Sequence, residues 1–318
     1  MVSLSYKTKQ FFWLILKITI VFGCVFFIYW RLTQNEELLL SNFINFCKQY
    51  NLLTIENTIV LFCFSFLNWI FEIKKWQTIV GSYQKINFST AVKQCLASLT
   101  ISLITPNRVG EYVAKAMYYA KAKQKRIIGY NAIGNGYQLG VTLFFGFLGV
   151  AFLSYQQHIT LLNRKITIII FIISGSGVCA YLLIKRIGIL KKWKRKCVVF
   201  TTSISTKTHW KVAFLSILRY VIFSHQFYFI ILLLHIDIEY FTAISAICSM
   251  YFISSFLPMI SFLDVVVKSS VAVWIFSFLE APPLFVLAAT TLVWIFNFVI
   301  PAILGSWFVL RYKPKLAI

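Results

Sequence analysis

Long apolar runs recur along the whole chain, and they restrict its fold more than any other feature of the sequence. An α-helix rises about 1.5 Å per residue, so about 20 apolar residues cover the ~30 Å hydrocarbon core of a bilayer. Only 13% of the residues are charged, roughly half the share found in soluble domains. Six segments are long enough, or nearly so, to cross: Phe11–Trp30, Ile55–Phe71, Ile127–Leu153, Ile166–Ile184, Val212–Leu234 and Leu284–Leu310. We therefore predict an all-α polytopic membrane protein, with residues 1–318 forming a single integral membrane domain.

Basic residues collect in particular connections between these runs. The chain has 31 Lys and Arg against 9 Asp and Glu, a net charge of +22. In a soluble protein this excess would suggest nucleic acid, but in a membrane protein the positive-inside rule accounts for it. With both termini in the cytoplasm, the strongly basic segments 72–126, 185–211 and 311–318 all face the same side. We expect a multi-pass protein of the cytoplasmic (inner) cell membrane, with membrane lipids and no nucleic acid among its partners.

Two apolar segments do not fit as simple crossings. In this topology Ala91–Ile104 starts and ends in the cytoplasm, and Ala243–Leu279 starts and ends outside. A full crossing by the first would move the six Lys and Arg residues of 108–126 outside or into the apolar core, which is unfavourable. We expect each segment to form a re-entrant helical hairpin. For the second, two complete spans over 243–257 and 261–279 would give the same topology.

The order of segments repeats in the two halves of the chain. Residues 1–155 and 160–318, approximately, each read span, span, hairpin, span, and the two halves start on opposite sides of the membrane. This order predicts an inverted repeat of about six transmembrane helices plus two re-entrant hairpins, an architecture found in many secondary transporters.

Both hairpins contain the same short pattern. A proline is followed within ten residues by an acid and, four residues after the acid, by a lysine, which places the acid and the lysine on one helix face. Proline ends the helix at each hairpin tip, and the freed peptide groups are tolerated at membrane depth only inside protein or beside water. Ionisable residues at such a place are candidates for function. The predicted substrate-binding residues are Pro106, Arg108, Glu111, Lys115, Pro258, Asp264 and Lys268.

These side chains carry both signs of charge. The carboxylates could hold an ammonium group or a proton, and the cations could hold a phosphate, with arginine offering a bidentate fork. A phospholipid headgroup contains such groups. Alternatively, each acid–lysine pair is an internal ion pair that helps its hairpin to insert.

Polar and small residues inside the spans are further candidates. For the amides the alternative is packing between helices, for the arginine it is snorkelling toward the basic side, and for the histidine it is a structural hydrogen bond. Gly136 and Gly140 are expected to form a helix-packing contact. The polar residues that would support the substrate site from behind are Asn135, Gln138, Arg219, His225 and Asn297.

Motifs for enzymatic or metal chemistry are absent from the sequence. It has no GxxxxGK[ST], HExxH or GxSxG pattern, its seven cysteines include no CxxC pair, and its four histidines are dispersed. We expect no catalytic residue, no metal and no cofactor. The basic stretch Lys185–Lys211 could attract anionic lipid or a soluble partner protein, although its role in orienting the chain accounts for it as well.

Four stretches of the sequence carry a family resemblance: SLITPNRVGEYVAKA (Ser102–Ala116), NAIGNGYQLGVTLFFG (Asn131–Gly146), SSFLPMISFLDVVVKSSVAVWIFSF (Ser254–Phe278) and WIFNFVIPAILG (Trp294–Gly305). The chain resembles the flippase-like membrane domain of the lysylphosphatidylglycerol synthase family, also called the multiple peptide resistance factor family. The resemblance implies paired re-entrant helices that translocate aminoacylated phospholipids or related lipids between leaflets.

Two departures from the family pattern affect the expected function. The soluble aminoacyl-transfer domain of the full-length enzymes has no counterpart here, and the second motif reads PMISFLD where many relatives have a glycine-rich version. We therefore expect a stand-alone lipid translocase that moves a phospholipid or a polyprenyl-phosphate lipid between leaflets. The alternative is a membrane-embedded lipid-modifying transferase or its non-catalytic membrane subunit.

Overall fold

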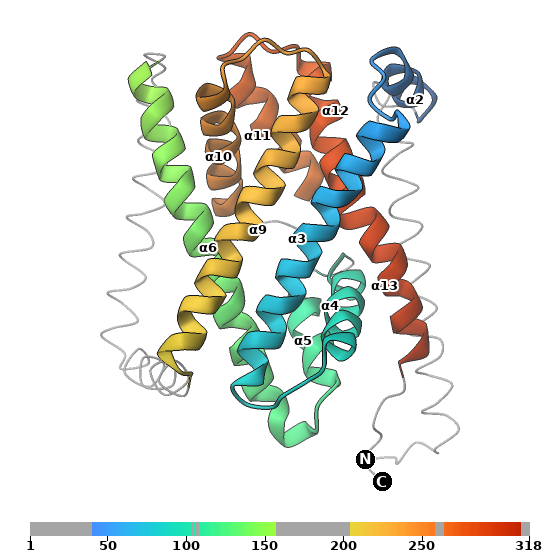
Figure 1. Ribbon diagram of the computed structural model, residues 1–318, viewed down its shortest axis with the longest axis vertical. Helices are drawn as coiled ribbons and strands as arrows, with labels where there is room; N and C mark the ends of the chain where they lie inside the picture. The colour runs from blue at the N-terminus through green and yellow to red at the C-terminus, as the bar shows by residue number, and fades with distance from the viewer. Residues whose placement is uncertain (1–39, 104, 106–107, 157–203, 258–263, 313–318) are drawn as a thin grey trace.

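The computed structural model describes residues 40–103, 105, 108–156, 204–257 and 264–312. Every regular element within these ranges is a helix (Figure 1), so the all-α prediction is confirmed there. The helices are α2 (Leu40–Gln49), α3 (Ile55–Gly81), α4 (Phe88–Leu103), α5 (Val109–Met117), α6 (Lys121–Gln156), α9 (Thr206–Leu233), α10 (Tyr240–Phe256), α11 (Asp264–Ser277), α12 (Pro283–Trp294), the π-helix η2 (Ile295–Val299) and α13 (Ile300–Arg311).

Within the described ranges, four helical segments are long and apolar enough to cross a membrane. They are α3, α6, α9 and the continuous stretch Pro283–Arg311, which α12, η2 and α13 form together. They coincide with four of the six predicted spans. The other two predicted spans, Phe11–Trp30 and Ile166–Ile184, lie outside the described residues, and so does most of the basic stretch Lys185–Lys211.

Helix α3 is longer than the span predicted for it. It begins after Thr54, whose side chain accepts a hydrogen bond from the backbone N–H of Asn57, a common way to satisfy the first turn. It continues past the predicted end at Phe71 to Gly81. The apolar face of the helix continues at helical spacing beyond Phe71, which explains the extension. The buried apolar residues of this added part are Ile73, Trp76, Ile79 and Val80.

Two pairs of short helices occupy opposite ends of the molecule. In Figure 1, α4 and α5 lie in the lower half and α10 and α11 in the upper half, whereas α3, α6 and α9 run through nearly the full length. The first pair is entered from the end of α3 and left toward the start of α6, both at the lower end. The second pair is entered and left at the upper end. The tips of the two pairs therefore point toward each other near mid-height.

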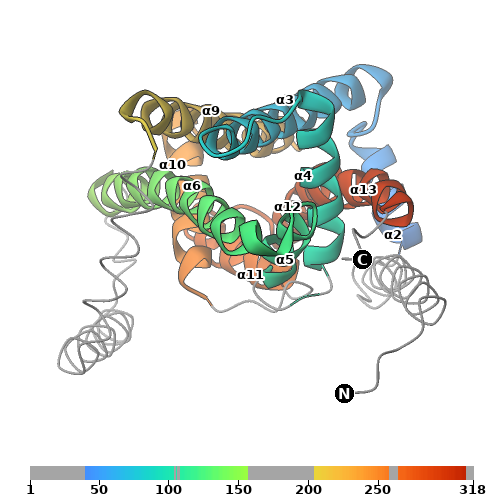
Figure 2. The same cartoon turned by 90° about the horizontal axis from the view of Figure 1, so that it is seen from below.

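Helices of each half of the chain pack against helices of the other half. Helix α3 packs along α9, α4 packs on α13, and α10 packs on α6. Figure 2 shows α3 and α9 side by side along one edge of the molecule. Each short pair therefore contacts the long helical segment that ends the other half.

Glycines allow the closest contacts between the backbones of these packed helices. A Cβ on Gly305 of α13 would overlap the backbone carbonyl of Leu96 on α4, and a Cβ on Gly149 of α6 would lie 2.6 Å from the carbonyl oxygen of Ser245 on α10. The prediction that Gly136 and Gly140 form such a contact is wrong for the described residues, since no described atom lies within 4 Å of a Cβ built on either. The helix-packing glycines are instead those that face α4 and α10.

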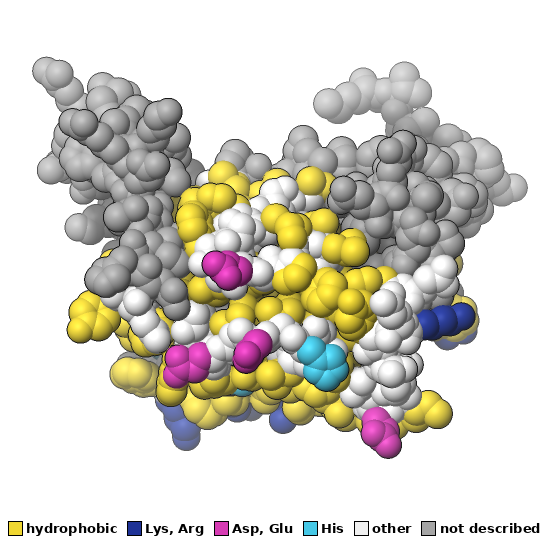
Figure 3. Space-filling model, turned by 90° about the horizontal axis from the view of Figure 1, so that it is seen from above, with side chains coloured by type: hydrophobic (Ala, Val, Ile, Leu, Met, Phe, Trp, Pro, Cys, Tyr) yellow, Lys and Arg dark blue, Asp and Glu magenta, His cyan; other side chains and the backbone are white. Residues whose placement is uncertain are grey.

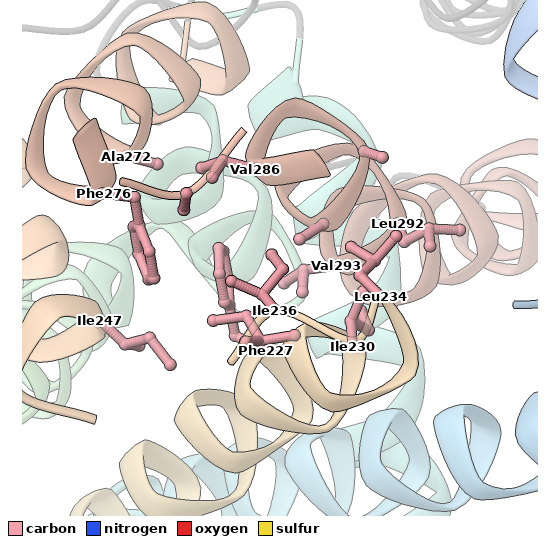
Figure 4. Close-up of a cluster of buried hydrophobic side chains, with 14 of the residues drawn as sticks. Phe227, Ile230, Leu234, Ile236, Ile247, Ala272, Phe276, Val286, Leu292 and Val293 are labelled. Carbon is pink, nitrogen blue, oxygen red and sulfur yellow. The ribbon is translucent and has the colours of Figure 1, made fainter. Parts of the chain in front are cut away.

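Each short pair is held by its own apolar core. At the upper end, buried side chains of α9, α10, α11 and α12 meet (Figure 4), and the rings of Phe227 and Phe276 stack with centroids 6.0 Å apart. At the lower end, Trp76, Cys95 and Tyr130 belong to a second buried cluster that joins α3, α4 and α6.

Most surface charge is divided by sign between the two ends, with Lys48 of α2 a basic residue at the acidic end. The described acids outside the interior lie at the upper end, seen in Figure 3, in the first turn of α3 and in the loops that follow α9 and α11. They are Glu56, Asp237, Glu239 and Glu280. Lysines and arginines line the lower end, at the starts of α6 and α9 and the end of α13; they include Lys121, Lys123, Lys125, Arg126, Lys207, Lys211 and Arg311.

Candidate functional site

A cavity of about 380 Å³ lies where the tips of the two short pairs meet. Its wall includes residues from the end of α4, the start of α5, the end of α10 and the first turns of α11, together with α3, α6, α9 and η2. Arg108, Arg219 and Lys268 all line it. Among the side chains that the structure describes, the charged groups that line the cavity are all cationic.

Arg108 reaches the cavity because of its position at the tip of the first pair. It precedes α5 with a left-handed backbone, φ 55°, a conformation that is unfavourable for a residue with a Cβ and that often accompanies function. Its guanidinium carbon lies 5.5 Å from the centre of the Phe298 ring, and its Nη2 lies 3.8 Å from a carboxylate oxygen of Glu111. Pro106, predicted to bend this tip, lies outside the described residues.

Lys268 reaches the same place from the second pair. Its Nζ also lies 5.5 Å from the centre of the Phe298 ring, so cations from the two tips approach one aromatic side chain. Helix α11 begins at Asp264, one turn before Lys268. Pro258 and the side chain of Asp264 lie outside the described part of the chain.

Arg219 is held in place by side chains of two other helices, α3 and α6. Its Nη1 lies 2.9 Å from Glu72 Oε2 on α3, its Nε donates to Asn68 Oδ1 at 3.0 Å, and its Nη1 donates to Gln138 Oε1 at 3.4 Å. The side chain therefore turns inward to a carboxylate and two amides, not outward to the basic end of the molecule as snorkelling would require. Gln138 lies on α6, so two of the predicted supporting residues, Gln138 and Arg219, contact each other.

Behind the cavity lies a buried charge cluster that the sequence did not single out. Glu72 pairs with Lys75 at 2.6 Å and with Arg219, and Lys115 Nζ lies 4.0 Å from its other oxygen. Glu72 and Lys75 expose only 8% and 2% of their surface. The sequence did contain a signal for this cluster. Apolar residues continue at helical spacing before Glu72 and after Lys75, which places both charged residues inside helix α3.

The predicted pair Glu111–Lys115 is an internal ion pair. Lys115 Nζ lies 2.8 Å from Glu111 Oε1 and 2.8 Å from Asn131 Oδ1, and it sits 4.6 Å from the centre of the Trp76 ring. Neither Glu111 nor Lys115 lines the cavity. The Glu111 carboxylate is therefore occupied by Lys115 and Arg108 and is not presented to a ligand.

A π-helical turn and a proline place Asn297 in the wall of the cavity. Pro301 has no N–H to donate to the Asn297 carbonyl one turn earlier, and the indole N–H of Trp69 donates to that carbonyl instead, at 3.1 Å. The Asn297 side chain accepts from Asn68 at 2.7 Å and donates to Gln226 at 2.6 Å. These amides join α3, α9 and η2, and they orient the partners of Arg219.

Two predicted supporting residues lie elsewhere. Asn135 donates to the Tyr112 hydroxyl at 3.2 Å, and neither residue lines the cavity. The ring of His225, a half-buried residue on α9, contacts the Val221 carbonyl and the Tyr240 hydroxyl. The described residues also include no group of three or more His, Cys, Asp and Glu placed to hold a metal ion.

Replacing Trp69 with Phe tests the hydrogen bond that the indole donates to the Asn297 carbonyl. The Asn297 carbonyl would lose the hydrogen bond from the Trp69 indole, and a typical hydrogen bond contributes about 0.5–1.5 kcal/mol, so we expect Trp69→Phe to lower the free energy of unfolding by that amount. Chemical unfolding in detergent measures it. The matched control is Trp210→Phe, because Trp210 is 74% exposed; equal stability of the two variants would contradict the role of Trp69.

No family model, no curated protein and no solved structure matches this chain.

Proposed function

We propose that this chain is a lipid translocase of the cytoplasmic membrane, and that the cavity between the two tips receives the headgroup of a phospholipid or polyprenyl-phosphate lipid while it crosses. The spans are α3, α6, α9 and α12–η2–α13, together with the predicted spans outside the described residues. The basic lower end faces the cytoplasm, following the positive-inside rule.

In this proposal α4–α5 and α10–α11 are re-entrant hairpins from opposite leaflets. Helix α4 has 16 residues and α10 has 17, which at about 1.5 Å per residue extend roughly 25 Å, less than a full crossing with its interfaces. Each pair returns to the end from which it came. The tips are then at mid-membrane depth, where irregular backbone is tolerated beside a cavity.

The observation that carries the proposal is the convergence of Arg108, Arg219 and Lys268 on one cavity that both tips line. Charged side chains at membrane depth are costly, and those kept there mark substrate pathways. The resemblance to the flippase-like domain of the lysylphosphatidylglycerol synthase family agrees with this proposal. The transferase alternative would use Glu111 and Asp264 as general bases, and of these the Glu111 carboxylate is engaged in ion pairs.

Leaflet exchange in vesicles tests the function. The full chain is reconstituted in liposomes with fluorescently labelled phosphatidylglycerol, and the outer-leaflet label is quenched chemically. We expect the protein to accelerate exchange, and Arg108→Gln to slow it at least tenfold, because that variant removes a cation from the cavity while Lys115 still pairs with Glu111. Lys123→Gln, on the exposed basic end, is the control. If lipid exchange with the wild-type chain is no faster than in protein-free liposomes, the proposed function is wrong.

A further inference from the structure

We propose that the cavity binds the phosphate of an anionic lipid headgroup, through Arg108, Arg219, Lys268 and the hydroxyl of Ser254, and that it disfavours aminoacylated headgroups. This inference rests on the proposed function and specifies its substrate class. It differs from the cationic cargo that the family resemblance implies.

The charges of the lining favour an anion. Three cations line the cavity, and no acid does so among the described side chains. If Asp264, whose side chain lies outside them, added its carboxylate, the lining would still be positive. The Glu72 and Glu111 carboxylates pair with the lysines behind the cavity and leave no described acid to receive an amine. Arginine and lysine together are the usual partners of a phosphate.

Ser254 supplies an independent indication of a ligand. It lies on α10, exposes 1% of its surface and lines the cavity, and its Oγ has no hydrogen-bond partner in the described structure. Buried polar groups without a partner are rare. Other serines in these helices donate to a carbonyl about one turn earlier, as Ser249 does to Ser245 and Ser270 does to Val266. The Ser254 hydroxyl is therefore a donor that a phosphate oxygen would satisfy.

The amides around Arg219 make its guanidinium a fixed part of the site. Its Nε and Nη1 already donate to Asn68 and Gln138, so the plane of the group is set before a ligand arrives. Preorganised donors lose less freedom on binding than flexible ones. The aromatic wall formed by Phe223, Trp294 and Phe298 is suited to the methylene groups next to a headgroup.

Lipid binding in detergent tests the headgroup class separately from transport. The purified full chain is titrated with short-chain phosphatidic acid, phosphatidylglycerol, phosphatidylethanolamine and lysyl-phosphatidylglycerol. Inorganic phosphate is titrated in parallel as the ligand without a lipid tail. Native mass spectrometry measures how much of each ligand is bound. We expect phosphatidic acid and phosphatidylglycerol to bind at least tenfold more tightly than lysyl-phosphatidylglycerol and than inorganic phosphate.

Ser254→Ala is the diagnostic variant. We expect it to weaken phosphatidic acid binding about tenfold and to leave the unfolding midpoint of the lipid-free protein unchanged or higher, because it removes an unsatisfied hydroxyl. Ser270→Ala, whose hydroxyl bonds its own helix, is the control and should bind normally. Lysyl-phosphatidylglycerol or inorganic phosphate binding as tightly as phosphatidic acid, or unchanged binding by Ser254→Ala, would overturn the inference. Binding as expected with no leaflet exchange would instead count against translocation alone.

Discussion

Glu72→Gln is expected to lower the free energy of unfolding by about 3–5 kcal/mol, the range seen when one partner of a buried ion pair is removed. Glu72 holds Lys75 at 2.6 Å and Arg219 at 2.9 Å. No other described carboxylate lies within ion-pair distance of either cation. Lys75 exposes only 2% of its surface, so its charge would remain buried without compensation. Chemical unfolding in detergent, read as the midpoint and its slope, measures the loss.

Two further variants make this result specific. Glu56→Gln removes an exposed acid from the first turn of the same helix and should change stability by less than about 1 kcal/mol, the usual contribution of a charge at a helix end. Glu72→Gln combined with Lys75→Met removes both charges of the closest pair and should recover most of the loss. A Glu72→Gln protein that unfolds at the wild-type midpoint would show that Glu72 does not hold this cluster together.

The sequence predicted the long helices well because their signal is local. Hydropathy over about 20 residues depends on no distant contact, and α6 and α9 lie where the runs Ile127–Leu153 and Val212–Leu234 indicated. The charges around Ala91–Ile104 predicted that this segment would itself form a hairpin, whereas the structure makes it a single helix, α4, and the chain returns through α5. The end of α3 was missed because a charged pair at 72 and 75 looks like the edge of a span until its partners on other helices are known.

The candidate site was predicted in part, for a related reason. The proline-containing motifs led to Arg108 and Lys268, which do meet at one cavity. The same motifs assigned Glu111 to the ligand, whereas the fold pairs it with Lys115 one helical turn away. Whether a carboxylate faces a ligand or its own helix depends on side-chain direction, which spacing does not determine. Ser254 had no signal at all, because an unsatisfied hydroxyl is a property of the packed structure.

Gly305→Leu is expected to separate α13 from α4 and to abolish binding of anionic lipid. Any Cβ at this position overlaps the Leu96 carbonyl and crowds the Thr100 side chain, and the hydrogen bond from Thr100 Oγ1 to the Ala302 carbonyl, 2.9 Å, would break. Overpacking a tight contact costs about 1–3 kcal/mol and more where backbone must move. Because α4 carries the tip that presents Arg108, a shift of α4 also disperses the cations of the cavity. Unfolding in detergent and native mass spectrometry with phosphatidic acid measure the two effects, and Gly136→Leu, on the open side of α6, should leave both within error. A stable Gly305→Leu protein that still binds phosphatidic acid would mean that the α4–α13 contact does not position the site.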